Sequence, residues 1–528
     1  MRLATLFFRP THHRADRVGR QKTLALRCAA IGLAAACQIG VATAQSDDTE
    51  RDEFFWLGEM NKATAVINSQ QGLLDKDKTP AIARALQDVL DAGNKPGGER
   101  PGRVIKFEPL LIDAGGMDVT LLHAGRSSQD MHATFRAAIL RDDLLELADH
   151  LNTTSKTLVE LAARHKATIV PNYTNGVAAQ PNSYGHQLLG HAAGLDRDAQ
   201  RIRQAYERID RSAMGTTVLN GTSWPLDRQR MADYLGFHAV VDNAYDASQI
   251  SSMDEPVEVG SIVTAIALHT GNFVEDLLTQ YADPQPWMLL QEGGDNTYVS
   301  SSMPQKRNPG LLNSTRSDAS YAITLALGPM MQMHNITPGM SDPKDATQNS
   351  AMVDAGITVV DKFDKILKAL RIDPERALAE LNSDWTASQE LADILMREHK
   401  LPFRVGHHFA SGVVSYAREH DIKPMDFPYE QAQRIYTEVV TAEDPEQPHE
   451  LPMSESQFRD ALDPTAIVNN RATRGGPQPA EMDRMLAEAR ERLKKQDQWI
   501  ADQREHIASS LDKLDTDFNK LLAPTDNG

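Results

Sequence analysis

Cysteine is almost absent from this chain of 528 residues, because Cys28 and Cys37 are the only two. Both lie in an N-terminal stretch that has the features of a removable leader, so the mature chain would contain no cysteine. This composition excludes disulfides, thiolate metal sites and cysteine nucleophiles. The histidines and carboxylates show no spacing typical of a metal site. We therefore expect no metal and no other cofactor.

Aromatic residues and positive charge are also scarce. Aromatics make up 6% of the chain, and the formal net charge is −18. An acidic surface repels phosphates, so we expect no nucleic-acid partner. No apolar run after residue 44 looks long enough to span a bilayer, so we expect no membrane segment in the mature chain. Helix-forming residues are plentiful, which favours an all-α fold.

The N-terminus has the three parts of a secretory signal peptide. Basic residues between Arg2 and Arg27 precede an apolar, Ala-rich stretch from about Cys28 to Val41. The small-x-small triplet Ala42-Thr43-Ala44 follows, as at a cleavage site. We therefore predict a signal peptide over residues 1–44 and a periplasmic or secreted mature chain. A lipoprotein anchored at Cys37, an organellar transit peptide and a wrongly assigned start codon remain open alternatives.

Apolar residues at heptad-like spacing predict several long helices. One such helix is predicted from about residue 182 to 211, where the spacings alternate between four and three. Its seam consists of Leu188, Ala192, Leu195, Ala199, Ile202, Tyr206 and Ile209. Further helices are predicted over 257–281, from Pro309 to about His334, and from Pro479 to Leu522. Long helices of this kind bury their seams against one another, which predicts an extended bundle and oligomerisation.

The length of the chain predicts three or so domains, because it exceeds what one compact core accommodates. We place the boundaries at 45–165 for an N-terminal helical domain, 166–400 for a central helix bundle and 401–528 for a C-terminal helical domain. Residues 104–122 contain Val, Ile and the pair Gly115-Gly116. We expect them to form the only short hairpin.

The most informative stretch runs from Ser300 to Pro309 and combines hydroxyls, an ammonium group and a carboxamide. Pro304 and Pro309 limit how much of it can be regular helix. A Ser-rich loop of this kind can carry a base over a pocket with a cation beside it. The full pattern Ser-x-x-Met-Pro-x-Lys-x-Asn-Pro resembles the signature loop of the aspartase/fumarase superfamily. Members of that superfamily break a C–N or C–O bond and usually release fumarate.

Other segments resemble argininosuccinate lyases in particular, and they follow the order of that family. They are Leu122-His123-Ala124-Gly125-Arg126-Ser127-Ser128-Gln129-Asp130, Tyr173-Thr174-Asn175-Gly176-Val177-Ala178-Ala179-Gln180-Pro181, Gly221-Thr222-Ser223-Trp224-Pro225-Leu226-Asp227-Arg228 and Pro402-Phe403-Arg404. The resemblance covers about residues 105–495. It implies an all-α, three-domain lyase with a central long five-helix bundle. It also implies a homotetramer in which each active site combines blocks from three subunits.

The chemistry of that family gives each block an expected role. Removing a proton next to a carboxylate produces a dianionic intermediate, which the site must stabilise with cations and amide donors. The resemblance implies Ser300 as the base, with Lys306 and Asn308 completing the catalytic set. The residues expected to bind a small dicarboxylate substrate are Ser127, Gln129, Thr174, Asn175, Gln180, Ser301 and Met303. The proton donor to the leaving amine is unassigned, with water or His132 as candidates.

Several positions depart from the argininosuccinate lyase pattern. The family's second block carries a His, and a Glu follows the signature Lys by seven residues; here these positions are Asn175 and Asn313. Two amides can share a hydrogen bond but cannot shuttle protons near neutral pH. Carboxymuconate cycloisomerases also lack this pair and remain active. Ser128-Gln129 replaces Arg-Asn, and the run Thr337–Asp345 lacks the aromatic and Gln residues expected to hold arginine.

These patterns support a C–N lyase that eliminates an amine from an N-substituted aspartate and releases fumarate. The departures lead to the hypothesis that argininosuccinate is not the physiological substrate. Two alternatives remain open. One is a carboxymuconate-cycloisomerase-like enzyme, and the other is a catalytically impaired binding or structural protein on the lyase scaffold.

Overall fold

The computed structural model describes residues 51–341 and 344–523, which belong to one compact unit. The predicted signal peptide over 1–44 lies outside the described residues, so it stays a prediction.

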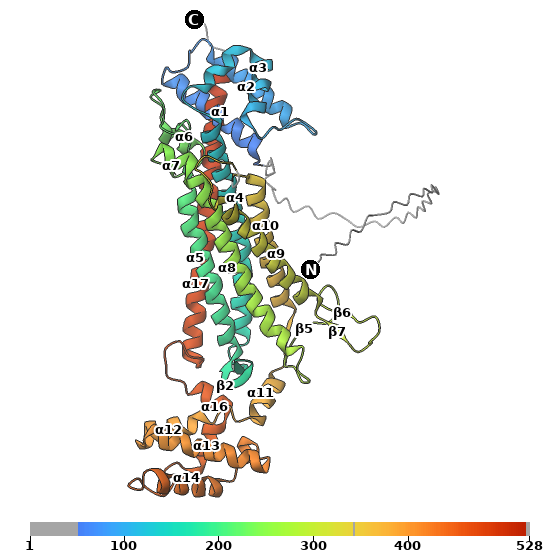
Figure 1. Ribbon diagram of the computed structural model, residues 1–528, viewed down its shortest axis with the longest axis vertical. Coiled ribbons are helices and arrows are strands. Elements are labelled where there is room, and N and C mark those ends of the chain that lie inside the picture. The colour runs from blue at the N-terminus through green and yellow to red at the C-terminus, as the bar shows by residue number, and fades with distance from the viewer. Residues whose placement is uncertain (1–50, 342–343, 524–528) are drawn as a thin grey trace, which may run out of the picture. The chain divides into compact units, whose positions relative to one another are not determined.

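The described chain is mostly helical, which confirms the all-α prediction (Figure 1). The helices of the N-terminal part are α1 (Glu53–Gln70), α2 (Thr79–Gly93), α3 (Val104–Gly115), the 3-10 helix η1 (Met117–His123) and α4 (Ser128–Arg164). Those of the middle are α5 (Tyr184–Ile209), α6 (Arg228–Tyr234), α7 (Ala244–Gln249), α8 (Ser251–Gln280), α9 (Gly310–Met333) and α10 (Ala346–Ala369). Those that follow are α11 (Pro374–Ser383), α12 (Gln389–His399), α13 (Phe403–His420), α14 (Tyr429–Glu443), α15 (Glu455–Leu462), α16 (Pro464–Asn469) and α17 (Pro479–Leu522).

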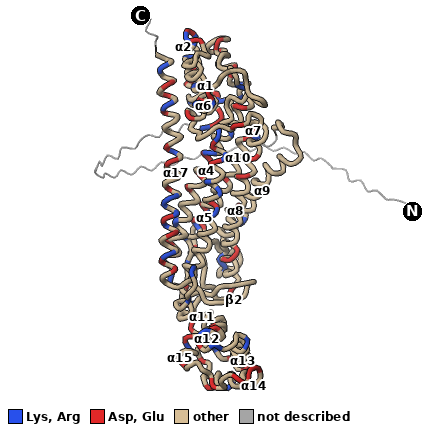
Figure 2. Tube along the Cα trace, turned by 90° about the vertical axis from the view of Figure 1, so that its left-hand side faces the viewer, with Lys and Arg blue, Asp and Glu red and all other residues tan. Residues whose placement is uncertain are grey.

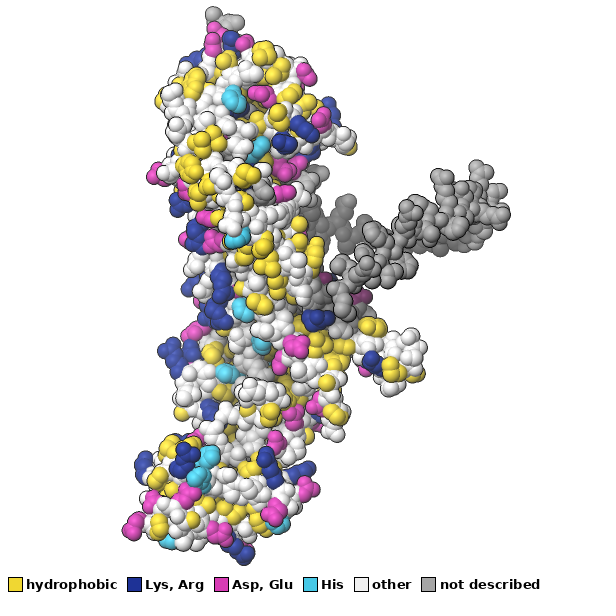
Figure 3. Space-filling model, viewed as in Figure 1, with side chains coloured by type: hydrophobic (Ala, Val, Ile, Leu, Met, Phe, Trp, Pro, Cys, Tyr) yellow, Lys and Arg dark blue, Asp and Glu magenta, His cyan; other side chains and the backbone are white. Residues whose placement is uncertain are grey.

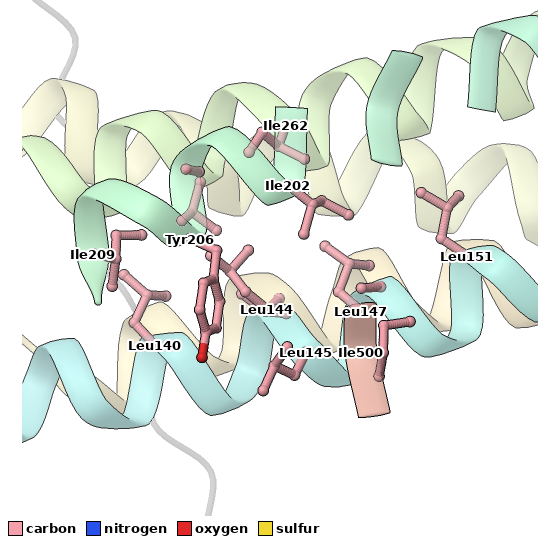
Figure 4. Packing of buried hydrophobic residues seen from close by; sticks show 14 of the residues in the cluster. Leu140, Leu144, Leu145, Leu147, Leu151, Ile202, Tyr206, Ile209, Ile262 and Ile500 are labelled. Atoms are coloured by element: carbon pink, nitrogen blue, oxygen red, sulfur yellow. The ribbon is translucent and has the colours of Figure 1, made fainter. Parts of the chain in front are cut away.

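The long helices α4, α5, α8, α9 and α10 lie side by side and pack against one another (Figure 1). The predicted heptad seam of α5 explains part of this packing, because Ile202, Tyr206 and Ile209 are fully or almost fully buried. Figure 4 shows Tyr206 and Ile209 directed at Leu140 and Leu144 of α4, and Ile202 directed at Leu147. Each such side chain stabilises the fold by about 1.5–3 kcal/mol through burial. The helix predicted over 182–211 is therefore confirmed, together with its buried face.

Helix α8 corrects one expectation from the sequence. It is long and apolar enough to cross a membrane by length and composition alone, with a mean hydropathy of 1.3 over its most apolar window. Half of that window is buried inside the molecule, where α8 packs on α5, α9 and α10. The expectation that no such stretch follows residue 44 was wrong, because a helix in the middle of a bundle is apolar on several sides, as a membrane span is.

Helix α17 joins parts of the chain that are far apart in sequence. It packs on α4 and α5 along the bundle and then on α1 and α2 (Figure 2). Its inward face consists of Ile500, Ile507, Leu511, Leu514 and Phe518, all buried. The Nζ atom of Lys62 in α1 donates to a carboxylate oxygen of Asp515 at 2.7 Å. The helix predicted over Pro479–Leu522 has these bounds in the structure.

The hairpin predicted over 104–122 is wrong. Residues 104–115 form α3, because Phe107 and Leu111 recur at helical spacing and bury one face. Gly116 has φ 72° and ends this helix instead of turning a hairpin.

The strands are short and occur in pairs. The pairs are β1 (Ile169–Thr174) with β2 (Val177–Ser183), β3 (Arg211–Ser212) with β4 (Ala239–Val240), β5 (Met288–Leu290) with β8 (Leu370–Ile372), and β6 (Tyr298–Val299) with β7 (Arg307–Asn308). The first and last of these pairs carry predicted site residues.

The helices from α12 to α15 have an apolar core of their own, built around Phe409, Phe427, Tyr436 and Phe458. Helix α4, which ends at Arg164, shares its core with the bundle helices. The proposed boundaries near residues 165 and 400 stay a prediction.

Candidate active site

The predicted signature loop is a hairpin. Tyr298 pairs with Asn308 and Val299 with Arg307, and the Ser300 N–H donates to the Lys306 carbonyl at 3.1 Å. The Arg307 guanidinium holds the loop closed, since it donates to the Glu292 carboxylate at 3.0 Å and to the Pro304 carbonyl at 2.7 Å. The short strand pairing and the turns at the prolines thus hold this loop in place, although it buries almost no apolar side chains.

The hydroxyl of Ser300 accepts two hydrogen bonds from the backbone of its own loop. Its Oγ accepts hydrogen bonds from the backbone N–H groups of Ser302 at 3.4 Å and Met303 at 3.2 Å. Donors aimed at an oxygen favour its ionised form. Ser301, Met303 and Lys306 are exposed around it. The Asn308 amide donates to the Tyr298 carbonyl at 3.3 Å, so Asn308 also stabilises the hairpin.

The second predicted block forms the β1–β2 hairpin. Asn175 has φ 54° and Gly176 has φ 75°, the left-handed values of a two-residue type I′ turn. Asn suits such a position, which gives a structural reason for Asn175 besides any catalytic one. Thr174 and Asn175 are exposed at the tip. The Gln180 amide donates to the Gln389 side chain of α12 at 2.8 Å.

The first predicted block begins helix α4. Ser127 is the N-cap, with Oγ accepting from the Gln129 N–H at 3.3 Å and the Ser127 N–H donating to the Asp130 carboxylate at 2.8 Å. This reciprocal capping fixes where α4 starts. Ser128 and Gln129 are then left facing a pocket, and Gln129 is exposed.

That pocket, which we call the α4–α10 pocket, has a volume of about 560 Å³. Its lining residues come from the start of α1, the start of α3 and the segment before it, the start of α4, and the start of α10 and the segment before it. They are Glu53, Gly102, Arg103, Ile105, Ser128, Gln129, His132, Phe135, Arg136, Ser341, Lys344, Asp345 and Ala346. Its size falls within the range of small-molecule sites. Sequence reasoning missed Arg103, Arg136 and Lys344, which come from segments far apart in the chain.

His132 lines the α4–α10 pocket as an uncharged ring. Its Nε2 atom accepts a hydrogen bond from the Val104 N–H at 3.3 Å. Burial, reinforced by the charges of Arg136 and Arg103, lowers the pKa of His132 to about 4. A ring that stays neutral at pH 7 and whose Nε2 atom already accepts a hydrogen bond is a poor proton donor to a leaving amine.

One chain does not bring all the predicted residues together. Ser127 and Gln129 lie at the start of α4, whereas Thr174 and Asn175 follow its other end. The 37 residues of α4 span about 55 Å at 1.5 Å per residue. Ser300 and Lys306 precede the start of α9, away from both (Figure 1). Within the described chain, no hydrogen bond joins the side chains of Asn175 and Asn313.

In the described part of the chain, no group of three or more His, Cys, Asp or Glu residues has the geometry to hold a metal ion.

Comparisons with known proteins find the same family that these sequence blocks resemble. A family model described as "Lyase" matches residues 117–323, and one described as "Argininosuccinate lyase C-terminal" matches residues 385–469. The argininosuccinate lyase of Geobacillus thermodenitrificans is 30% identical over 449 residues, 82% of this chain and 92% of that protein. That of Methanosarcina acetivorans is 28% identical over 493 residues, 92% of this chain and 95% of that protein.

Solved structures show the same fold. EDDS lyase in complex with formate superposes with a TM-score of 0.79 at 24% identity, covering 89% of this chain and 92% of that one. The β-carboxy-cis,cis-muconate cycloisomerase of Acinetobacter calcoaceticus gives a TM-score of 0.60 at 15% identity, over 83% of this chain and 96% of that one. The chain therefore belongs to the aspartase/fumarase superfamily, close to the argininosuccinate lyases, and is a lyase acting on carbon–nitrogen bonds.

Proposed function

We propose that this lyase eliminates an amine from an N-substituted aspartate and releases fumarate, with Ser300 as the base. The ionised Ser300 Oγ takes a proton from the carbon next to one carboxylate. Lys306 and Asn308 stabilise the charge that develops on that carboxylate. The C–N bond then breaks, its electron pair goes to the nitrogen, and the nitrogen takes up a proton and leaves as the amine.

The observation that carries this proposal is the pair of backbone N–H groups donating to Ser300 Oγ. A serine is a poor base unless its surroundings favour the alkoxide. The hairpin supplies such surroundings, and it positions Lys306 directly across from Ser300.

We also propose that the active site is completed by other copies of this chain in a homotetramer. The separation of the three blocks along α4 and α9 supports this. Apolar side chains on α8 and α9 remain exposed in the single chain, among them Leu268, Leu327 and Met331, the last being 70% exposed. Figure 3 shows hydrophobic side chains gathered along this part of the bundle. A contiguous apolar face of this kind favours association.

The test is a comparison of Ser300→Ala with Ser302→Ala in the mature chain. We expect Ser300→Ala to lower the turnover number for an N-substituted aspartate by about 10²–10⁴-fold, because the general base is lost. Ser302→Ala is the matched control, since its backbone N–H and not its hydroxyl contacts Ser300. Fumarate formation is followed by ultraviolet absorbance. Equal activity in both variants would contradict the role of Ser300.

The two alternatives predict other outcomes of the same assay. A cycloisomerase turns over a muconate-type acid without releasing fumarate. An impaired scaffold binds dicarboxylates without turnover. Curated relatives at 28–30% identity are argininosuccinate lyases, which supports the lyase over both alternatives. Export to the periplasm remains part of the proposal, on the sequence of residues 1–44 alone.

A further inference from the structure

The α4–α10 pocket has an excess of positive charge that nothing in the reaction explains. Arg136 comes from α4, Lys344 from the segment before α10, and Arg103 from the segment before α3. They are accompanied by the carboxylates of Glu53 and Asp345. The Asp345 carboxylate is already occupied as the N-cap of α10, where it accepts from the Gln348 N–H at 3.1 Å.

Arg136 is the central observation. It is only 7% exposed, and its Nε and one Nη atom are buried without a hydrogen-bond partner among the described residues. A buried guanidinium with unsatisfied donors is costly unless a ligand satisfies them. Arginine presents its donors as a planar fork that matches a carboxylate.

Glu255 does not satisfy that need. Its carboxyl is the acidic group that acts on Arg136 most directly, yet no ion pair within 4 Å forms between them among the described residues. Burial raises the pKa of Glu255 to about 8, so its carboxyl is a weak counter-ion for Arg136 at neutral pH.

Lys344 adds a second cation, which makes a single hydrogen bond to the described residues. Its Nζ atom donates one hydrogen bond to the Ser248 carbonyl at 2.9 Å, and an ammonium group has three donors. Arg103 is exposed at the rim and makes no ion pair with another described residue. The pocket therefore contains the buried guanidinium of Arg136 and the ammonium group of Lys344. The guanidinium of Arg103 lies at its rim, and Gln129 is next to these cations.

We propose that the α4–α10 pocket binds a carboxylate on the amine half of the substrate, so that the amine released is an acidic amino compound. This inference rests on the proposed function, because Lys306 and Asn308 are assigned to the succinate half there. Argininosuccinate has its guanidinium at the bond that breaks, and its far end carries an ammonium group beside the carboxylate. That ammonium would be a third cation against Arg136 and Lys344, which disfavours argininosuccinate.

The test uses two substrates of matched size, N-(2-carboxyethyl)aspartate and its amide N-(2-carbamoylethyl)aspartate, with argininosuccinate as a third. We expect kcat/KM for fumarate release to be at least about tenfold higher for the carboxylate than for the amide, as one well-placed charge-assisted contact provides. Argininosuccinate should be the poorest of the three.

Substitutions in the α4–α10 pocket test which residues cause the preference for the carboxylate substrate. Arg136→Met should lower kcat/KM for the carboxylate substrate at least about tenfold and change that for the amide by less than about twofold. Arg136→Lys should recover part of the loss, because it restores the charge without the fork. Arg208→Met, at an exposed ion pair with Glu258 outside the pocket, is the control and should change neither. If Arg136→Met does not fold, Lys344→Met replaces it and should show the same loss of kcat/KM for the carboxylate substrate alone.

The failure of this inference differs from failure of the proposed function. Fumarate release that favours the amide or argininosuccinate, with no differential effect of Arg136→Met, overturns the inference and leaves the lyase intact. Absence of fumarate from all three substrates overturns the proposed function. Calorimetric titration then still tests whether the pocket prefers a carboxylate. N-(2-carboxyethyl)aspartate should bind more tightly than its amide, and Arg136→Met should remove the difference.

Discussion

At the scale of single residues, burial decides which charges near the site are present at neutral pH. Burial, followed by repulsion from Arg136, lowers the pKa of Lys344 to about 8. Burial lowers the pKa of Arg136 to about 10, so its guanidinium stays charged well above neutrality. His132, with a pKa of about 4, is neutral over the same range. Lys344 is therefore the lining group of this pocket that changes charge just above physiological pH, and Glu255 behind Arg136, with a pKa of about 8, loses its proton in the same range.

This assignment predicts a pH dependence of substrate affinity. Lys344 is charged below about pH 8 and loses its proton as the pH rises through that value. KM for N-(2-carboxyethyl)aspartate should therefore rise above pH 8, by up to about tenfold per pH unit, and level off where Arg136 alone holds the carboxylate. Initial rates between pH 6.5 and 9.5, about one and a half units on either side of the transition, measure this.

The amide substrate and Lys344→Arg are the controls for that measurement. The amide carries no charge in the pocket, so its KM should stay flat. Arginine remains protonated throughout the range, so Lys344→Arg should reduce the rise for the carboxylate substrate to the part that deprotonation of Glu255 causes. A parallel rise for both substrates would show that another group titrates.

At the scale of elements, the sequence predicted the long helices well and the short ones poorly. The helices ending near Ile209 and His334, and the one over 479–522, have apolar residues at regular spacing over many turns, which fixes both type and length. Residues 104–122 offered only a few Val and Ile residues and a Gly pair. Gly116 serves as a helix end there, and the same glycine signal suits a turn.

The hairpin that does exist carried a stronger signal than the one predicted. Asn175-Gly176 between two short runs is the typical sequence of a type I′ turn. The resemblance directed attention to Asn175 as a replaced catalytic residue, so its role in the turn was missed. Of the site, the sequence could predict the residues in contiguous motifs. Arg103, Arg136 and Lys344 meet only through the tertiary packing of α3, α4 and α10, which no local pattern encodes.

The packing of α17 leads to a stability prediction. Phe518 is 1% exposed, within the core shared by α17 and α1. Phe518→Ala should lower the free energy of unfolding by about 3–5 kcal/mol, because it leaves a cavity. Phe403→Ala removes the same ring at a site that is 42% exposed in α13. That control should change the free energy by about 0.5 kcal/mol or less. Urea unfolding of both variants measures the difference, and equal losses would contradict the packing.

At the scale of the whole molecule, the three predicted blocks lie at separate places along α4 and α9. Each block is held by its own local structure: a capped helix start, a type I′ hairpin and a proline-closed hairpin. Such blocks can be presented to neighbouring copies without any change within one chain. Closed symmetric assemblies are the common way in which identical chains share sites.

Shared sites predict that two inactive variants rescue each other. Thr174→Val and Lys306→Met each remove a residue from a different block. If a site takes the two blocks from different copies, random mixing of equal amounts leaves about a quarter of the sites with both residues intact. Co-refolding the two variants and assaying fumarate release should recover about that fraction of wild-type activity. A mixture as inactive as its components would show that each chain forms its own site.

The contact between Lys62 and Asp515 joins residues 453 positions apart. During translation, α1 and α2 leave the ribosome long before α17 does, and domains generally fold in the order in which they emerge. Here the first helices lack the apolar face that completes their core until α17 has been synthesised. Contacts of such long range also slow folding. The nascent N-terminal helices thus expose apolar surface for most of synthesis, which makes them natural clients of chaperones that hold chains unfolded.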